Sequence, residues 1–190
     1  MSRPSPDNAA GGHRARGNRA GGADIDRAGL ELRPATDDDR AFLLAVYAST
    51  RAEELAVVPW TDEQKAAFVQ MQFEAQDASY HQSYPEADFS VVRREGLDVG
   101  RLYVARGEAE VLLIEIALLP EYRGRGIGSR LLGDLLGSAD RDGLPVTLHV
   151  EPWNPARRLY ERLGFESRGV NGPYESMVRP ARPERPKAVS

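Results

Sequence analysis

The stretch EYRGRGIGSRLL, residues 121–132, concentrates glycine and positive charge where a helical pattern begins. It contains three glycines and three arginines: Gly124, Gly126, Gly128, Arg123, Arg125 and Arg130. The first N–H groups of a helix have no partner within the helix, and the helix dipole gives them partial positive charge. Glycine allows a ligand to approach the main chain closely, and arginine donates paired hydrogen bonds to phosphate oxygens. The stretch therefore predicts a site for a phosphate-bearing ligand, with a pyrophosphate as the expected group.

Two common phosphate-binding motifs do not fit this stretch. The nucleoside-triphosphate loop ends in Gly-Lys-Ser/Thr, but this loop has no lysine. The dinucleotide pattern GxGxxG requires a glycine where Ser129 stands. The pattern present is R-x-x-G-x-G, formed by Arg123, Gly126 and Gly128. Taken alone, it has an alternative interpretation as a tight turn with incidental arginines.

A second motif, NPARRLYERLGF, begins at Asn154 and contains Tyr160, Gly164 and Phe165. Together, IALLPEYRGRGIGSRLL and HVEPWNPARRLYERLGF resemble the two signatures of the GNAT superfamily of N-acetyltransferases. The similarity in the order of elements extends over roughly residues 30–180. The resemblance implies that the phosphate-bearing ligand is acetyl-CoA, used as a co-substrate.

Hydrophobic periodicity predicts the elements that must position these motifs. Helices are expected from Thr36 to about 56, from Thr61 to about 78, from the glycine loop to Gly143, and over 155–164. Strands are expected at 30–35, 88–95, 98–106, 109–119, 144–150, 165–170 and 174–179. This order indicates a mixed α/β domain. The resemblance implies a single-domain GNAT-like fold, a mixed central sheet of about six to seven strands flanked by about four helices.

The composition is that of a soluble globular domain with loose ends. The chain has 190 residues, of which 41% are hydrophobic and 28% charged. Residues 1–28 have too little apolar surface to form a core, so we expect a disordered N-terminal tail. The GNAT-like acetyltransferase domain is expected at 29–180, followed by a C-terminal tail at 181–190.

The residue types that are absent exclude several kinds of chemistry. The chain has no cysteine, which excludes disulfides, thiolate metal sites and thiol nucleophiles. Its three histidines lie far apart in sequence, so no metal site is predicted. No apolar run approaches the ~20 residues that span a bilayer. The N-terminus is polar, so we expect no secretory signal, no membrane association and a cytoplasmic location.

The resemblance implies how the chain holds acetyl-CoA. Two neighbouring parallel strands, 109–119 and 144–150, would splay apart and admit the pantetheine arm. The arm would pair with the main chain of the first strand at Ile116, Ala117 and Leu118. The pyrophosphate would rest on the amides of Arg123, Gly124, Arg125, Gly126, Ile127, Gly128 and Ser129.

Two residues of the second motif have implied roles and simpler alternatives. Asn154 would hydrogen-bond to the pantetheine arm, or it caps the following helix, or both. Tyr160 would be the general acid that protonates the leaving thiolate. The alternative for Tyr160 is a half-buried tyrosine that packs beside Leu159 and Leu163.

The general base is less well defined by the sequence. The family sometimes carries a glutamate where this chain has Leu112, and Glu115 is the acid inside the apolar run of the same strand. Strand alternation places Glu115 on the opposite face from Leu112. Two interpretations stay open: a catalytic base acting through water, or a structural partner for an arginine. His149 and Glu151 are other candidates, and a water chain suffices if the amine arrives neutral.

The predicted reaction is acetyl transfer from acetyl-CoA to a primary amine by direct attack in a ternary complex. The oxyanion would be stabilised by a main-chain N–H, expected at Leu118. The alternative is a non-catalytic acyl-CoA-binding or sensing module with the same fold. The net charge of −4 argues against nucleic acid as a partner, and the protein is expected to be a monomer or homodimer.

The acceptor amine is expected to bind near the two N-terminal helices, in the region 36–90. This region holds eleven acidic residues against three basic ones, which favours a cationic small-molecule or peptide amine. The alternative is that these acids lie on solvated outer faces of the helices. Side chains that could contact the acceptor are Arg51, Glu54, Trp60, Gln72, Tyr80, His81 and Tyr84.

Overall fold

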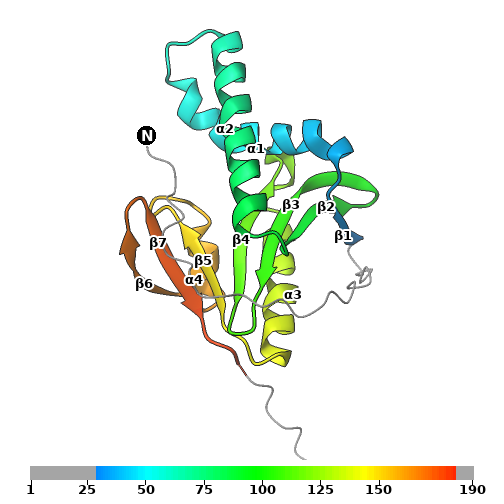
Figure 1. The fold of residues 1–190 in the computed structure, drawn as a ribbon, viewed down its shortest axis with the longest axis vertical. Helices are drawn as coiled ribbons and strands as arrows, with labels where there is room; N and C mark the ends of the chain where they lie inside the picture. Colours follow the sequence, from blue (N-terminus) through cyan, green and yellow to red (C-terminus); the bar gives the residue numbers. More distant parts are fainter. Residues whose placement is uncertain (1–28, 183–190) are drawn as a thin grey trace, which may run out of the picture. The chain divides into compact units, whose positions relative to one another are not determined.

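The structure, a computed structural model, describes residues 29–182. The tail predicted at 1–28 lies outside the described residues, as do all but two residues of the tail predicted at 181–190. The elements, labelled in Figure 1, are β1 (Leu30–Pro34), η1 (Asp37–Asp39), α1 (Arg40–Ala56), α2 (Asp62–Ser83), β2 (Asp88–Arg94), β3 (Leu97–Arg106), β4 (Val111–Leu118), η2 (Pro120–Tyr122), α3 (Ile127–Arg141), β5 (Val146–Val150), α4 (Arg157–Arg162), β6 (Glu166–Asn171) and β7 (Tyr174–Arg179).

The strands form a seven-stranded mixed sheet in the order β1-β2-β3-β4-β5-β7-β6. β4 and β5 are parallel, whereas β1 with β2, β5 with β7, and β6 with β7 are antiparallel. With the four α-helices of the described residues, this confirms the predicted fold class. The described chain divides into two compact units, residues 29–103 with 115–127 (the first unit) and residues 104–114 with 128–182 (the second unit).

In the first unit, α1 and α2 pack against each other and against β2 (Figure 1). The core between them consists of Leu43, Tyr47, Val69, Phe73 and Val91. The predicted capping box at the start of α2 is present, because Gln64 N–H donates to Thr61 Oγ1 at 3.3 Å and Thr61 N–H donates to Gln64 Oε1 at 2.9 Å. α2 runs to Ser83, past the predicted end near 78, because the first helix-breaking residue after it is Pro85.

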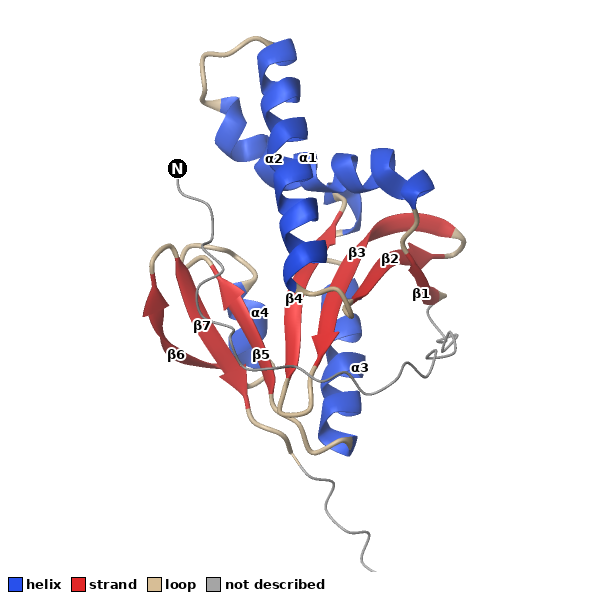
Figure 2. Cartoon of the chain, in the orientation of Figure 1, coloured by secondary structure: helices blue, strands red, loops and turns tan. Residues whose placement is uncertain are grey.

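In the second unit, β5, β7 and β6 lie side by side (Figure 2). The amphipathic helix α3 buries Leu131, Leu132, Leu135, Leu136 and Ala139. Gly143, at φ +69°, follows α3 as predicted. α4 begins at Arg157 and is shorter than the predicted helix at 155–164. The reason is local, because Asn154 Oδ1 accepts a hydrogen bond from Ala156 N–H at 2.9 Å and holds these residues in a turn.

Candidate functional site: the glycine–arginine loop and its neighbours

The loop between η2 and α3 has the main-chain conformation that its glycines permit. Gly124 lies at φ +69° and Gly126 at φ +80°, in the left-handed region that favours glycine. A Cβ at either position would meet nothing within 4 Å, so the main chain here is open. Gly128 and Ser129 lie in the first turn of α3. An exposed main chain that leads into a helix N-terminus suits an anionic ligand.

The three arginines of this stretch have different surroundings. Arg130, on α3, pairs with Asp134 one turn later, with Nε 3.3 Å from Oδ2. The guanidinium of Arg125 lies 5.9 Å from the ring centre of Tyr122. Arg123 donates to Leu118 O on β4 and to Ser49 on α1. The three arginines therefore differ in their partners, and Arg123 bonds to elements outside the loop and α3.

The end of β4, where pantetheine is expected to pair, lies very close to β3. A Cβ on Gly100 would lie 2.3 Å from Ala117 O and 3.1 Å from Leu118 Cα, so only glycine permits this approach. Leu119 N–H also donates to Val99 O at 2.9 Å. Gly100 was missed in the sequence analysis, although an isolated glycine inside a strand pattern is a signal of close main-chain approach.

Glu115 forms an ion pair with a fully buried arginine. Arg101 is only 1% exposed, and its Nη2 lies 2.6 Å from Glu115 Oε1 and 3.1 Å from Gln76 Oε1. Burial is the largest single influence and lowers the pKa of Arg101, but the charge and hydrogen bond of Glu115 together with Tyr103 and Tyr80 outweigh it, so the pKa is raised. The pair fits the structural interpretation of Glu115, and its catalytic role stays a prediction. Arg101 was not predicted, because an arginine in a strand is usually exposed.

Aromatic rings enclose the buried guanidinium of Arg101. Its Cζ lies 5.8 Å from the ring centre of Tyr47, 5.9 Å from that of Phe73 and 5.2 Å from that of Tyr103. Burial raises the pKa of the Tyr103 hydroxyl. The Nε of Arg101 and the Oε2 of Glu115 are buried and have no hydrogen-bond partner among the described residues. The Arg101 guanidinium is thus surrounded by aromatic rings and paired with Glu115, yet one polar atom of each side chain lacks a hydrogen bond among the described residues.

The second unit contains the residues of the second motif. Tyr160 is 7% exposed, and its ring lies 5.8 Å from that of Phe165 in an edge-on arrangement. It is thus more deeply buried than the half-buried tyrosine of the packing alternative, and its role as general acid stays a prediction. Asn154 caps the turn before α4 rather than the helix itself, whose N-cap is Ala156, and a role of Asn154 in binding pantetheine stays a prediction. His149 is exposed on β5.

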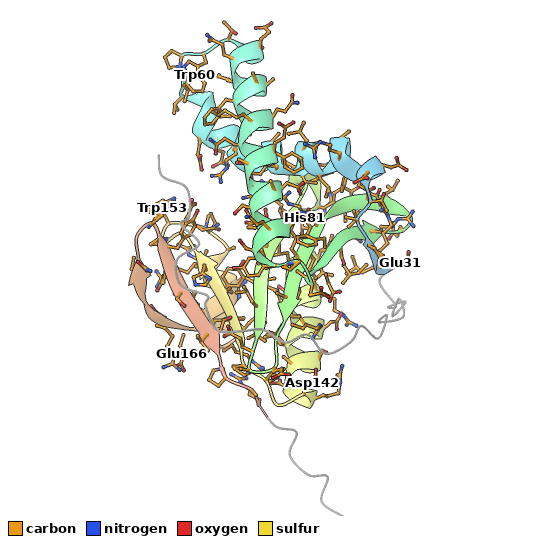
Figure 3. The ribbon with its side chains drawn as sticks, viewed as in Figure 1. Glu31, Trp60, His81, Asp142, Trp153 and Glu166 are labelled. Atoms are coloured by element: carbon orange, nitrogen blue, oxygen red, sulfur yellow. The ribbon has the colours of Figure 1, made fainter. Side chains whose placement is uncertain are left out.

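The candidate acceptor residues on α1 and α2 are spread along the helices. Arg51 pairs with Glu54 at 3.2 Å, and Trp60 packs edge-on against Phe68 at 5.3 Å. Figure 3 shows Trp60 near one end of α2 and His81 near the other. α2 has 22 residues, which at a rise of ~1.5 Å per residue makes it about 33 Å long. Trp60 and His81 therefore cannot contact the same small acceptor.

Neither a metal centre nor a membrane span is found in the described part of the chain. Residues 29–182 contain no group of three or more His, Cys, Asp or Glu side chains that could hold a metal ion. None of the helices described is long and apolar enough to cross a bilayer.

Comparison with known proteins decides the family. The profile of the acetyltransferase (GNAT) domain matches residues 85–167. An uncharacterised N-acetyltransferase of Mycobacterium bovis is 31% identical over 138 residues, which make up 71% of this chain and 86% of that protein. The chain belongs to the GNAT superfamily. N-acetyl transfer is the general reaction class of its named GNAT relatives, and the resemblance seen in the two sequence motifs is confirmed.

Other GNAT relatives extend this comparison. A ribosomal protein bS18-alanine N-acetyltransferase of Haemophilus influenzae is 39% identical over 66 residues, which cover 34% of this chain and 45% of that enzyme. The chain thus aligns with less than half the length of that relative. The crystal structure of the PaiA N-acetyltransferase of Thermoplasma acidophilum with coenzyme A has a TM-score of 0.61 at 18% identity and covers 80% of this chain and 98% of that one. This second likeness shows the GNAT fold.

Proposed function

We propose that the protein transfers an acetyl group from acetyl-CoA to a primary amine by direct attack in a ternary complex. The observation that carries the proposal is the loop from Arg123 to Ser129, which combines two left-handed glycines, an exposed main chain and a helix N-terminus in a chain of this family. Such a loop suits the pyrophosphate of acetyl-CoA. The pairing of β4 with β5 covers Val111–Leu113, although β4 continues to Leu118. The main chain at 116–118 lies beyond this pairing, which supports its proposed role in binding pantetheine.

In this proposal, acetyl-CoA supplies the thioester that the amine attacks. The N–H of Leu118 stabilises the negative charge that develops on the thioester oxygen. The hydroxyl of Tyr160 gives its proton to the departing sulfur and is reprotonated from solvent. Asn154 hydrogen-bonds to the pantetheine arm. Glu115 is the candidate that accepts the amine proton through water, and a water chain alone replaces it if the amine arrives neutral.

The proposed acceptor is a cationic amine: a small amine, an amino-acid derivative or a basic peptide terminus. The acidic excess of residues 36–90 supports this choice, because an acidic rim raises the local concentration of cations. The Haemophilus influenzae relative is named for the alanine of a ribosomal protein, which adds a peptide N-terminus to the acceptors that should be tried first.

The test is acetyl-CoA turnover with a panel of small amines and peptides, followed by thiol release and by mass spectrometry of the product. We expect an acetylated amine and initial-rate patterns of a sequential mechanism, in which both substrates must be bound. A parallel-line pattern would contradict direct attack. Binding of acetyl-CoA without turnover of any acceptor would favour the non-catalytic sensing module, for which Leu112 in place of the family's glutamate is the supporting feature.

A further inference from the structure

Arg123, the first residue of the R-x-x-G-x-G pattern, connects the cofactor loop to two other elements of the first unit. Its Nε donates to Leu118 O at 2.8 Å, at the end of β4. Its Nη2 donates to Ser49 Oγ at 2.8 Å and to Ser49 O at 3.3 Å, on α1. Ser49 Oγ in turn donates to Val46 O at 2.7 Å, which fixes the hydroxyl on the helix. The guanidinium thus joins β4, the loop and α1.

The main-chain N–H of Arg123 is also engaged within the chain. It donates to Pro120 O at 3.2 Å, and Tyr122 N–H donates to Leu119 O at 3.0 Å. These bonds close the short turn η2 directly before the glycines. A phosphate contact made by Arg123 itself would have to replace hydrogen bonds that already hold the side chain and the turn. The geometry therefore favours an indirect contribution of this residue to ligand binding.

We propose that Arg123 is a positioning residue and that Ser49, through Arg123, is part of the acetyl-CoA site; this rests on the function proposed above. Gly124 follows Arg123 directly and Gly126 comes two residues later, and glycine loses more conformational freedom on ordering than any other residue. The bonds of Arg123 to Leu118 and to Ser49 fix the start of the loop before the ligand binds. The ligand then has less of the loop to order, and such preorganisation increases affinity. Ser49 lies outside both sequence motifs, so the sequence alone does not indicate this role.

The proposal also couples the cofactor loop to α1, one of the two helices that form the expected acceptor region. The contact with Ser49 depends on the position of Arg123, the first residue of the loop. A ligand that orders the loop therefore also stabilises this contact and the helix turn around Ser49. We expect bound acetyl-CoA to slow amide hydrogen exchange around residue 49 in the wild-type chain, and to do so less when the Ser49 hydroxyl is removed.

The chain offers a matched control for Ser49. Thr50, the next residue of α1, donates its hydroxyl to Tyr47 O at 2.7 Å, in the same way that Ser49 donates to Val46 O. Ser49→Ala and Thr50→Ala therefore each remove a hydroxyl that bonds to the helix three residues earlier. Only the first removes an acceptor of Arg123. Urea unfolding of both variants should show similar small losses of stability.

The test is the acetyl-CoA dissociation constant, measured by calorimetry on the full chain. We expect Ser49→Ala to raise it about three- to tenfold, the scale of one ordinary hydrogen bond, because Arg123 keeps its bond to the main-chain Ser49 O. Thr50→Ala should change it less than about twofold, and Ser49→Thr should restore it because the hydroxyl is kept. Equal affinity of wild type and Ser49→Ala would overturn the proposal, as would equal losses in Ser49→Ala and Thr50→Ala.

A double-mutant cycle tests whether Ser49 acts through Arg123. If Ser49 acts through Arg123, the double variant Ser49→Ala/Arg123→Gln should bind acetyl-CoA like Arg123→Gln alone. Additive losses would contradict this dependence. If the wild-type chain binds no acetyl-CoA, both the proposed function and the proposed role of Ser49 and Arg123 are wrong. If wild type binds acetyl-CoA and Ser49→Ala binds it equally well, only the proposed role of Ser49 and Arg123 is wrong.

Discussion

The two units of the protein each bury an arginine beside a carboxylate, and they satisfy the carboxylate to different degrees. In the second unit, Arg179 donates from Nη1 and Nη2 to the two oxygens of Asp140, and Asp140 Oδ1 also accepts from Arg182 N–H at 2.6 Å. In the first unit, Arg101 reaches one oxygen of Glu115, and the buried Oε2 of Glu115 has no partner among the described residues. Both carboxylate oxygens of Asp140 therefore accept hydrogen bonds, whereas within residues 29–182 only one oxygen of Glu115 does.

This difference bears on the open role of Glu115. A buried acceptor without a partner costs about 1–3 kcal/mol, so its presence in a folded protein calls for an explanation. One explanation is a function that needs the oxygen, such as accepting a proton through water. Asp140 offers no oxygen for such work, and we assign it a structural role only.

The largest expected effect is on stability, from Arg101→Met. Removing one member of a buried ion pair typically costs about 3–5 kcal/mol, because it leaves the other charge uncompensated. Adding Glu115→Leu should recover much of this loss, because two apolar side chains of similar size replace the pair. Urea unfolding at equal protein concentration measures both. An unchanged stability of Arg101→Met would show that the pair contributes little.

The double variant Arg101→Met/Glu115→Leu, in which stability is expected to be restored, also tests the role of Glu115. If it is folded and still turns over acetyl-CoA like wild type, Glu115 is a structural partner of Arg101. If it is folded but its rate falls, and the rate of Glu115→Gln falls in the same way, the carboxylate takes part in the reaction. Wild-type turnover by Glu115→Gln would exclude a catalytic base at this position.

The next effect in size concerns Tyr160 in the second unit. Tyr160→Phe should lower kcat on the order of 10²-fold, the scale of a lost general acid, with acetyl-CoA affinity retained. Phenylalanine keeps the ring that packs on Phe165, so the fold should persist. Steady-state kinetics and calorimetry on the same preparation check both parts. A kcat equal to that of wild type would reduce Tyr160 to a packing role.

A smaller effect is expected at Asp140, and it depends on pH. The hydrogen bonds from Arg179 hold the pKa of Asp140 below its ordinary value of 3.8. The pair therefore stabilises the fold fully above the unfolded-state pKa, and this contribution is lost as the pH falls below it. Asp140→Asn should cost about 1.5–3 kcal/mol near neutral pH, the range for hydrogen bonds to charged groups. The difference from wild type should shrink below about pH 4; a difference that grows in acid would contradict the assignment.

The fold and the open, left-handed conformation of the glycine loop were predictable because their signals are local. A nearly continuous apolar run marks β4, and glycine with arginine before a helical pattern marks the loop. Gly100 carried a local signal, an isolated glycine in a strand, but its close neighbour at 117 is not visible in the sequence. The contacts of Arg101 and Ser49 could not be predicted because their partners, at 115 and 123, are distant in sequence. The length of α2 was underestimated because propensity does not fix a helix end until a breaker such as Pro85 appears.

The smallest predicted effect is on acceptor choice. If the acidic excess of residues 36–90 attracts the acceptor, kcat/KM should favour a cationic amine over a matched anionic amine at low salt. The preference should shrink as the screening length falls from ~30 Å at 0.01 M to ~8 Å at 0.15 M salt. A ratio that does not change with salt, or that favours the anion, would show that these acids only solvate the helices.

The most direct test of the account is the affinity of the glycine loop for acetyl-CoA, measured by calorimetry on wild type, Gly126→Ala and Gly133→Ala. Gly126 lies at φ +80° with open space at the Cβ position, so alanine strains the loop conformation without a clash. Gly133, in α3, also has open space and lies outside the loop, which makes it the control. We predict that wild type and Gly133→Ala bind acetyl-CoA alike, and that Gly126→Ala raises the dissociation constant about five- to thirtyfold, as expected for about 1–2 kcal/mol of strain. Equal binding by all three, or no binding by wild type, would contradict the account.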